Sequence, residues 1–261
     1  MARAPAAAAA AREAAVVAAL ESLAGLAPSS VLTARLKRAA PLLEACDPQA
    51  AHVADPAWAA LLDAVTVQET RLYRHPSQAD CAGALLPAAL QRAREAGRGF
   101  RMLSAGCATG EEAFTLAAQA MQAEASPSGL EVLGLDLCRP ALESAAAGII
   151  APGLGDPLAL VPDALRPWLA DTDGSPRLHP ALRRSLDFRR ANLLEGLGAT
   201  GFDVIFCRNV LIYLTDQARE RVVASLIAGL RPGGLLALGP SDRPPSGLRP
   251  MGESIWQKPD E

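Results

Sequence analysis

Short apolar runs alternate with longer amphipathic stretches along the C-terminal part of the chain. The apolar runs predict buried strands at Phe100–Ala105, Glu131–Asp136, Leu186–Asn192, Phe202–Cys207 and Leu235–Gly239, and a last strand near Ser254–Lys258. The amphipathic stretches predict helices at Glu111–Glu124, Pro140–Ala147 and Asp216–Leu230. Strands that alternate with helices indicate a parallel sheet with right-handed crossovers. We therefore predict an α/β domain over residues 100–261.

The N-terminal part has a different pattern. Apolar residues recur at helical spacing from Val17 to Leu36, and prolines and glycines interrupt them, which predicts a small all-helical domain at residues 1–64. We expect the Ala-rich first residues to form a frayed lead-in to a helix, because Arg12 and Glu13 rule against a signal peptide. Residues 65–99 would contain a linker and a connecting helix at Ala84–Arg94.

Two stretches interrupt these regular patterns. Val65–Pro76 could be a plain linker or an ordered segment over a pocket, and its apolar residues favour the ordered segment. Residues 148–182 are rich in proline, glycine and aspartate and are too long for a simple crossover, so we expect an excursion from the sheet there.

Composition narrows the classes of function. The chain has 261 residues, a formal net charge of −3 and a sequence pI of about 5.7, which argues against a general nucleic-acid binder. Its five cysteines show no metal-binding or disulfide spacing, so we expect no metal and a cytoplasmic location. No window approaches a transmembrane span. Arg35, Lys37 and Arg38 form a basic cluster that is either a solvated face or a docking patch for an acidic partner.

The stretch FRMLSAGCATGEEAF, residues 100–114, joins the first predicted strand to a helix. Gly106 and Gly110 allow a tight turn, and Thr109 is placed to cap a helix that opens with Glu111 and Glu112. A parallel sheet binds ligands at the carboxyl ends of its strands. The stretch therefore predicts a cofactor-binding turn.

Polar residues follow the other predicted strands as well. Asp136 ends the second strand, where a carboxylate can accept both hydroxyl groups of a ribose. Asn192 follows the third strand, and Arg208 and Asn209 follow the fourth. A glycine turn together with a ribose carboxylate indicates a cofactor that contains a nucleoside.

The charge at the turn indicates which cofactor. Glu111 and Glu112 would repel a pyrophosphate, and neither glycine-rich phosphate motif is present. S-adenosylmethionine carries a ribose and a positive sulfonium but no phosphate, so it fits better. The acidic pair could also simply complement the helix dipole, but Asp136 weakens that alternative.

Methyl transfer to a carboxylate needs no general base, because the acceptor is ionised at neutral pH. We expect Arg74 to hold such an acceptor and Tyr213 to orient it through a hydrogen bond. Tyr213 could instead be a core aromatic residue, because Leu211, Ile212 and Leu214 surround it.

Four sequence blocks now point to a family. In order they are TVQETRLYRHP, SAGCATGEEAF, GLDLCRPALESAAAGII, and FDVIFCRNVLIYL followed by LRPGGLLALGPSD. With them the chain resembles the CheR-type chemotaxis-receptor methyltransferases, which are protein-glutamate O-methyltransferases. The resemblance runs from about Val17 to the C-terminus and implies a class I S-adenosylmethionine-dependent methyltransferase fold, Rossmann-like and mostly parallel, behind a small helical domain.

The resemblance also implies roles for individual residues. The implied cofactor contacts are Gln68, Thr70, Arg74, Glu112, Asp136, Asn192, Leu193, Arg208 and Asn209, in addition to the turn at Gly106 and Gly110. Arg74 and Tyr213 correspond to residues near the transferred methyl group. The chain departs from the family at Gln68, which is usually Asn, and at Leu72–Tyr73, which are usually two Phe.

The implied partner is the cytoplasmic domain of a chemoreceptor, whose acidic helix would face Arg35, Lys37 and Arg38. Residues 148–182 fall where the family carries a small β-subdomain that can grip a receptor tail. We expect a monomer. Two alternatives stay open: a non-catalytic module that binds cofactor or receptor, and a small-molecule carboxyl methyltransferase.

Overall fold

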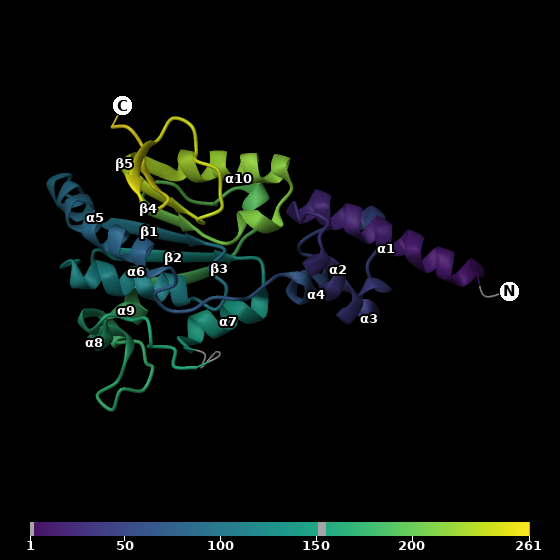
Figure 1. Cartoon of the computed structure of the whole chain (residues 1–261), viewed down its shortest axis with the longest axis horizontal. Coiled ribbons are helices and arrows are strands. Elements are labelled where there is room, and N and C mark those ends of the chain that lie inside the picture. The colour runs from purple at the N-terminus through teal and green to yellow at the C-terminus, as the bar shows by residue number, and fades with distance from the viewer. Residues whose placement is uncertain (1–2, 151–154, 261) are drawn as a thin grey trace.

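The computed structural model describes residues 3–150 and 155–260. A bundle of helices lies at one end of a twisted sheet that has helices on both faces (Figure 1). The bundle consists of α1 (Arg3–Ala24), α2 (Ser30–Arg38), α3 (Ala40–Leu43), the 3-10 helix η1 (Pro48–Ala50) and α4 (Pro56–Val65). The lead-in that we expected to fray is helical from Arg3 onward, and residues 1–2 lie outside the described part.

The helical bundle has its own apolar core. Leu20, Leu36, Trp58 and Leu62 are almost completely buried in it. Side chains cap its helices: Ser29 Oγ accepts a hydrogen bond from the Leu32 N–H at 3.1 Å, which starts α2 where the chain turns after α1.

The sheet has the strand order β3-β2-β1-β4-β5-β7-β6. Its strands are β1 (Phe100–Ala105), β2 (Leu130–Asp136), β3 (Leu186–Arg190), β4 (Phe202–Cys207), β5 (Leu230–Leu238), β6 (Arg249–Gly252) and β7 (Ile255–Gln257). The first five strands are parallel, as predicted, and β7 runs antiparallel to β5 and β6.

The strand predictions missed one strand and placed the start of another too late. The strand β6 was not predicted, because it is short and mostly exposed and therefore lacks an apolar run. We also expected the fifth strand to begin at Leu235, but β5 already begins at Leu230. The pairing of β4 with β5 shifts register between Phe202 and Val204, so the strand accommodates the Pro-Gly-Gly segment through an irregularity.

Helices cover both faces of the sheet (Figure 1). One face packs on α5 (Pro76–Glu95) and α6 (Glu111–Gln122), and the other face packs on α10 (Asp216–Gly229). The helix α5 begins eight residues before the predicted Ala84, because Pro76 suits a first helical turn and the helix tolerates Pro87. The helix α7 (Arg139–Ala147) follows β2 directly.

The excursion at residues 148–182 leaves the sheet before β3. It contains η2 (Asp163–Leu165), α8 (Arg166–Leu169) and the start of α9 (Pro180–Ser185), and a single bridge pairs Ala170 with Pro176. Residues 151–154 of this stretch lie outside the described part. Among the described residues, two further 3-10 helices are η3 (Leu193–Glu195) and η4 (Leu211–Tyr213).

Candidate functional site

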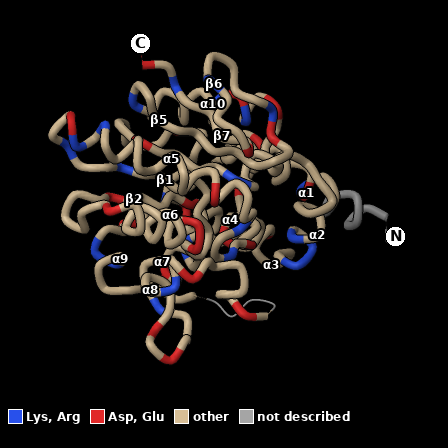
Figure 2. Tube along the Cα trace, turned by 60° about the vertical axis from the view of Figure 1, so that its left-hand side comes forward, with Lys and Arg blue, Asp and Glu red and all other residues tan. Residues whose placement is uncertain are grey.

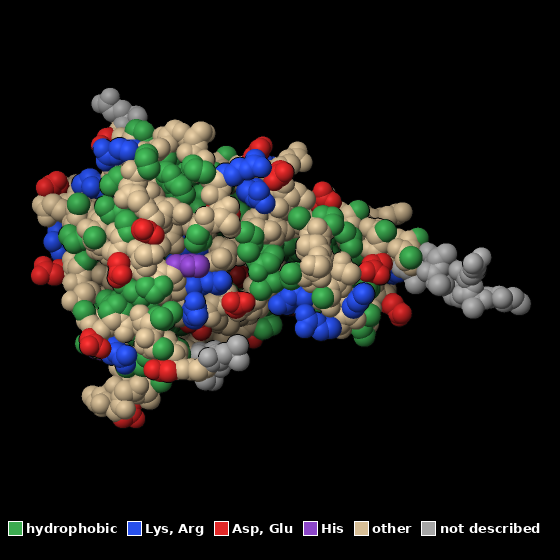
Figure 3. Space-filling view, in the orientation of Figure 1, with side chains coloured by type: hydrophobic (Ala, Val, Ile, Leu, Met, Phe, Trp, Pro, Cys, Tyr) green, Lys and Arg blue, Asp and Glu red, His purple; other side chains and the backbone are tan. Residues whose placement is uncertain are grey.

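A cleft opens between the carboxyl ends of the strands and the helical bundle. The strand order reverses between β1 and β4, which is the position where open parallel sheets bind their ligands. The cleft encloses about 1130 Å³ of empty space, counting the part open to solvent. Figure 3 shows a hollow between the bundle and the rest of the molecule, with Lys and Arg side chains near its border.

Most of the sequence-predicted site residues meet in this cleft. Those that line it are Thr70, Arg74, Gly106, Glu112, Asp136, Asn192, Leu193, Arg208, Asn209 and Tyr213. Gln68 and Gly110 do not line it. Gln68 Nε2 instead donates to Thr66 Oγ1 at 2.8 Å, and Gly110 packs against Phe114 under the turn.

The glycine turn brings the backbone close to its neighbours. Gly106 has a φ of +78°, and a Cβ added there would lie 2.2 Å from Val210 Cγ2. Gly110, with a φ of +99°, is the N-cap of α6. The predicted Thr109 cap was therefore wrong: Thr109 Oγ1 donates to Glu111 Oε2 at 2.6 Å and caps no backbone N–H. A left-handed residue is needed at the cap, and glycine adopts that conformation without strain.

Backbone N–H groups hold the carboxylate of Asp136. Its Oδ2 accepts from Ala108 N at 2.8 Å, and its Oδ1 accepts from Cys138 N at 2.9 Å. Burial raises the pKa of this carboxyl, while the N–H donors of Cys138 and Ala108 act in the opposite direction. Each oxygen keeps a further lone pair, so the fixed carboxylate can accept hydroxyl donors from the cleft.

A buried ion pair lies at the floor of the cleft. Arg208 Nε donates to Glu112 Oε2 at 2.7 Å, and the two side chains are only 3% and 10% exposed. Ser104 Oγ donates to the other oxygen of Glu112 at 2.7 Å. The charge of Glu112, which the sequence analysis placed near a positive cofactor, thus also has a partner within the chain.

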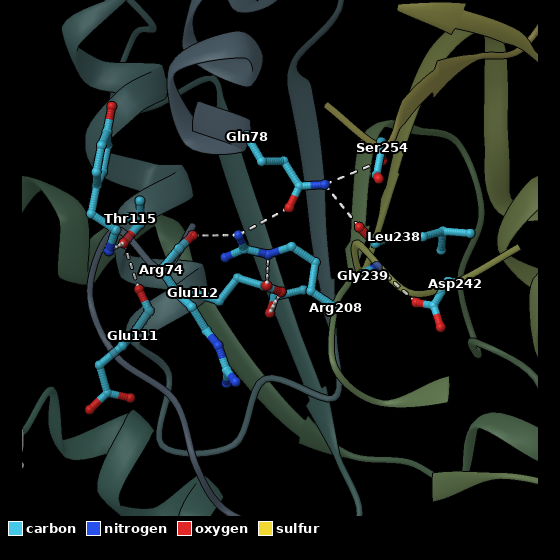
Figure 4. A network of polar contacts seen from close by, with 12 residues as sticks. Arg74, Gln78, Glu111, Glu112, Thr115, Arg208, Leu238, Gly239, Asp242 and Ser254 are labelled. Carbon is cyan, nitrogen blue, oxygen red and sulfur yellow. Dashed lines mark hydrogen bonds and ion pairs between the residues drawn. The ribbon is translucent and has the colours of Figure 1, made fainter. Parts of the chain in front are cut away.

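Arg208 connects this ion pair to the segment that precedes α5. Its Nη1 donates to the Arg74 carbonyl at 2.6 Å and to Gln78 Oε1 at 3.3 Å (Figure 4). Gln78 Nε2 in turn donates to the Leu238 carbonyl at 2.8 Å. The sequence analysis did not identify Gln78, because a single polar residue in a helix gives no signal of such distant partners. The network fixes the backbone of Arg74 relative to β4 and β5.

Arg74 and Tyr213 reach the cleft from different segments. Arg74 Nη1 donates to the Glu69 carbonyl at 2.8 Å, and its Nη2 lies 3.8 Å from Oε1 of the exposed Glu69 side chain. This second contact is long and hydrated, so another carboxylate can compete for the guanidinium. Tyr213 is half-buried and lines the cleft, so it is not the core aromatic residue of the alternative interpretation. Its carbonyl accepts from Ala27 N at 2.8 Å, so the helical bundle holds its backbone.

The helical bundle supplies a wall of the cleft that the sequence analysis did not predict. The residues of this wall are Ala24, Leu26, Ala27, Ser29, Val31 and Leu32. Gly25, with a φ of +68°, turns the chain there, and a Cβ on it would lie 2.5 Å from Ala218 Cβ. The Gly-Leu-Ala-Pro break was visible in the sequence, but its contact with the second domain was not.

Asn192 connects the third strand to the same bundle. Its Oδ1 accepts from Leu194 N at 3.2 Å, and its Nδ2 donates to the Leu23 carbonyl at 2.7 Å. Asn209 has a φ of +58° and lines the cleft, and its side chain lies within hydrogen-bonding reach of His75.

The two departures from the family at Leu72 and Tyr73 lie in the core rather than on the cleft. Leu72 is 1% exposed and Tyr73 is 4% exposed, and both pack with α5 and α6. They therefore do not form the apolar wall of the site.

The basic cluster divides into two parts. Lys37 and Arg38 are exposed at the end of α2, where Figure 2 shows basic residues gathered. Arg35 instead turns inward and donates to the Thr66 carbonyl at 2.9 Å. It holds the linker in place and is not part of a free surface.

Within the described ranges, no group of three or more His, Cys, Asp or Glu side chains is arranged to hold a metal ion. Among the helices of residues 3–150 and 155–260, none is both long and apolar enough to cross a membrane.

Comparison with known proteins identifies the family. Residues 68–251 match the family described as "CheR methyltransferase, SAM binding domain". The chain is 31% identical over 193 residues to "Chemotaxis protein methyltransferase 1" of Pseudomonas aeruginosa, covering 70% of this chain and 68% of that protein. It is 32% identical over 253 residues to "Probable biofilm formation methyltransferase WspC" of the same species, covering 89% of this chain and 58% of that one.

Among solved structures, the chain is similar to CalS10, an amino pentose methyltransferase from Micromonospora echinaspora. That similarity has a TM-score of 0.37 and 23% identity, over 63% of this chain and 49% of the other. The family match and the mostly parallel sheet confirm the expected class I S-adenosylmethionine-dependent methyltransferase fold. The chain belongs to the CheR methyltransferase family.

Proposed function

We propose that this protein methylates glutamate side chains on the cytoplasmic helices of a chemoreceptor, with S-adenosylmethionine as the methyl donor. The products would be a glutamate methyl ester and S-adenosylhomocysteine. One observation carries the proposal: Asp136, Arg74 and Tyr213, which come from separate parts of the chain, line the same cleft at the reversal of the strand order.

The residues of the cleft suit the donor. Asp136 would accept the ribose hydroxyls, Asn192 and Leu193 would border the adenine, and the turn at Gly106 would bring the backbone close to the ligand. When bound, S-adenosylmethionine supplies a methyl group on a positively charged sulfur.

The residues around the acceptor act by positioning. The guanidinium of Arg74 would bind the glutamate carboxylate, and the Tyr213 hydroxyl would donate a hydrogen bond that orients it. The carboxylate is already ionised, so the chain needs to move no proton. The apolar wall from the helical bundle would exclude water from the nucleophilic oxygen.

The test is methyl incorporation from labelled S-adenosylmethionine into receptor fragments that carry Glu or Gln at the candidate sites. We expect labelling of the Glu fragments alone, and equal labelling of both would contradict carboxylate chemistry. Arg74→Ala should abolish turnover and keep S-adenosylhomocysteine binding, whereas Asp136→Ala should weaken that binding. Arg71→Ala is the matched control, because Arg71 is exposed and does not line the cleft.

The same assay distinguishes the two alternatives. Receptor binding by calorimetry without any turnover would indicate a non-catalytic module. Lys37→Ala with Arg38→Ala should raise the KM for receptor fragments and leave methylation of a small carboxylic acid unchanged. Deletion of residues 1–64 is a poor test, because it would remove a wall of the cleft under either function.

A further inference from the structure

An ion pair joins the helical bundle to the connection that follows Asp136. Asp63, on α4, accepts from the backbone N–H of Arg139 at 2.9 Å through Oδ1, and from Arg139 Nε at 2.8 Å through Oδ2. Arg139 Nη2 lies 2.6 Å from the same Oδ2. The Asp63 side chain is 12% exposed and that of Arg139 is 44% exposed, so this contact between the two parts of the chain is shielded on the Asp63 side and open to solvent on the other.

The pair stands at the first turn of α7. Helices begin with N–H groups that have no partner within the helix, and carboxylates satisfy them well. The N-cap of α7 is Cys138, whose side chain makes no cap hydrogen bond. The Cys138 N–H goes to Asp136, and the next N–H, that of Arg139, goes to Asp63. The carboxylates of Asp136 and Asp63, which come from different parts of the chain, therefore accept consecutive backbone N–H groups at the start of α7.

This arrangement links Asp63 to the orientation of Asp136. The Asp136 carboxylate is held on one side by the Cys138 N–H, and the residue after Cys138 is fixed by Asp63. If Asp63 releases Arg139, the start of α7 can shift, and the hydrogen bond that orients Asp136 shifts with it. Of the further donors to Asp136, Ala108 N belongs to a different loop and Leu137 N is its neighbour in the chain, so neither one fixes the start of α7.

We propose that Asp63 is a positioning residue for the cofactor, which holds the start of α7 so that Asp136 presents its carboxylate to the cleft. The inference rests on the proposed function in taking Asp136 as the residue that binds the ribose. It assigns the helical bundle a part in cofactor binding that is separate from any contact with a receptor.

The experiment measures S-adenosylhomocysteine binding to the full-length chain by calorimetry. We expect Asp63→Ala to weaken binding on the order of tenfold, a size typical of coupling between neighbouring groups. Asp63→Asn keeps an oxygen for the Arg139 N–H and loses the charge, so its effect should be smaller. Because the readout is cofactor binding and not methyl transfer, a wrong assignment of the acceptor would leave this result unaffected.

A double-mutant cycle tests whether Asp63 acts through Asp136 or only holds the helical bundle against the rest of the chain. In the Asp136→Ala background, Asp63→Ala should have no further effect on S-adenosylhomocysteine binding, because the group that it positions is gone. An equal loss in both backgrounds would overturn the proposal. So would an unchanged affinity in Asp63→Ala with a lowered thermal midpoint.

The matched control lies on the same helix. Asp55 caps the start of α4 by accepting from Ala57 N at 2.9 Å and from Trp58 N at 3.1 Å, but its carboxylate binds within the bundle. Asp55→Ala should lower the thermal midpoint and leave S-adenosylhomocysteine affinity unchanged. If Asp55→Ala weakened binding as much as Asp63→Ala, general loosening of the bundle would explain both results and the proposal would be wrong.

Discussion

Arginine–carboxylate pairs lie at both ends of the parallel strands, which we call the amino edge and the carboxyl edge of the sheet. Solvent reaches the two pairs to different extents. At the carboxyl edge, Arg208 Nε lies 2.7 Å from Glu112 Oε2, and the two side chains are 3% and 10% exposed. At the amino edge, Arg101 Nε lies 2.8 Å from Glu131 Oε2, and the two side chains are 26% and 44% exposed. The shortest N–O distances are nearly equal, but Arg101 donates two hydrogen bonds to Glu131, whereas Arg208 donates one to Glu112. The more exposed pair thus has the more complete geometry, and the buried pair differs from it chiefly in its lack of water.

The two pairs also differ in the residues around them. Arg101 and Glu131 face each other across the register of β1 and β2, so their pair supports strand alignment at the surface. Arg208 and Glu112 belong to a network that borders the cleft and reaches Ser104, Arg74 and Gln78 (Figure 4). An arginine–carboxylate pair thus supports the alignment of β1 with β2 at the amino edge. At the carboxyl edge, another such pair supports the shape of the cleft.

The largest expected effect is that of Arg208→Met. It leaves the Glu112 carboxylate buried without its cation, and we expect a loss of about 3–5 kcal/mol in the free energy of unfolding. Urea unfolding measures this loss, and calorimetry should show weakened S-adenosylhomocysteine binding. Adding Glu112→Leu should recover part of the stability, because a buried ion pair replaced by apolar groups costs little, but it should not recover binding.

Arg101→Met at the amino edge is the control for that experiment. It should cost far less stability and leave S-adenosylhomocysteine binding unchanged, because its partner stays hydrated. Equal losses of unfolding free energy from Arg208→Met and Arg101→Met would show that burial does not set the contribution of each ion pair to stability.

Asp203→Asn should have an intermediate effect. Asp203 lies at the amino edge, yet its side chain is 6% exposed, and it binds Arg98 at 2.7 Å and the Arg101 N–H at 2.9 Å. Asparagine keeps an acceptor for the N–H but loses the charge, which should cost about 1–2 kcal/mol in urea unfolding. S-adenosylhomocysteine affinity should not change, and a marked loss would mean that the amino edge also shapes the cleft.

The edges of the sheet also show how far sequence reasoning extends. The bounds of β1 and β4 were predicted correctly, because a buried strand is encoded locally by a short apolar run. The placement of Asp136 at the end of β2 followed from the same local signal.

The partners within the site could not be predicted in this way. Arg208 and Glu112 are 96 residues apart in the chain, and only the crossing of β4 beside β1 brings them together. The wall formed by Leu26 and Ser29 depends on how the bundle docks, which no local pattern encodes. Gln68 was placed in the site by its resemblance to a family position, but its amide turns to Thr66.

The smallest expected effect concerns the exposed pair and its dependence on pH. Hydrogen bonding from Arg101 is the main cause that lowers the pKa of Glu131 below 4.5, and the charges of Arg101 and Arg189 add to it. A carboxyl whose pKa is lower in the folded chain stabilises the fold at pH values above its unfolded pKa. That contribution is lost as the pH falls through the folded-state pKa.

Glu131→Gln removes this titration. At neutral pH the variant should be less stable than the natural chain by less than about 1 kcal/mol, because Glu131 is largely hydrated. Urea unfolding over a series of falling pH values should show the two chains converging below the ordinary Glu range, and added salt should shrink the neutral-pH difference. A difference that grew as the pH fell would mean that the carboxyl form of Glu131 is the stabilising one, and the exposed pair would then have no share in holding β1 beside β2.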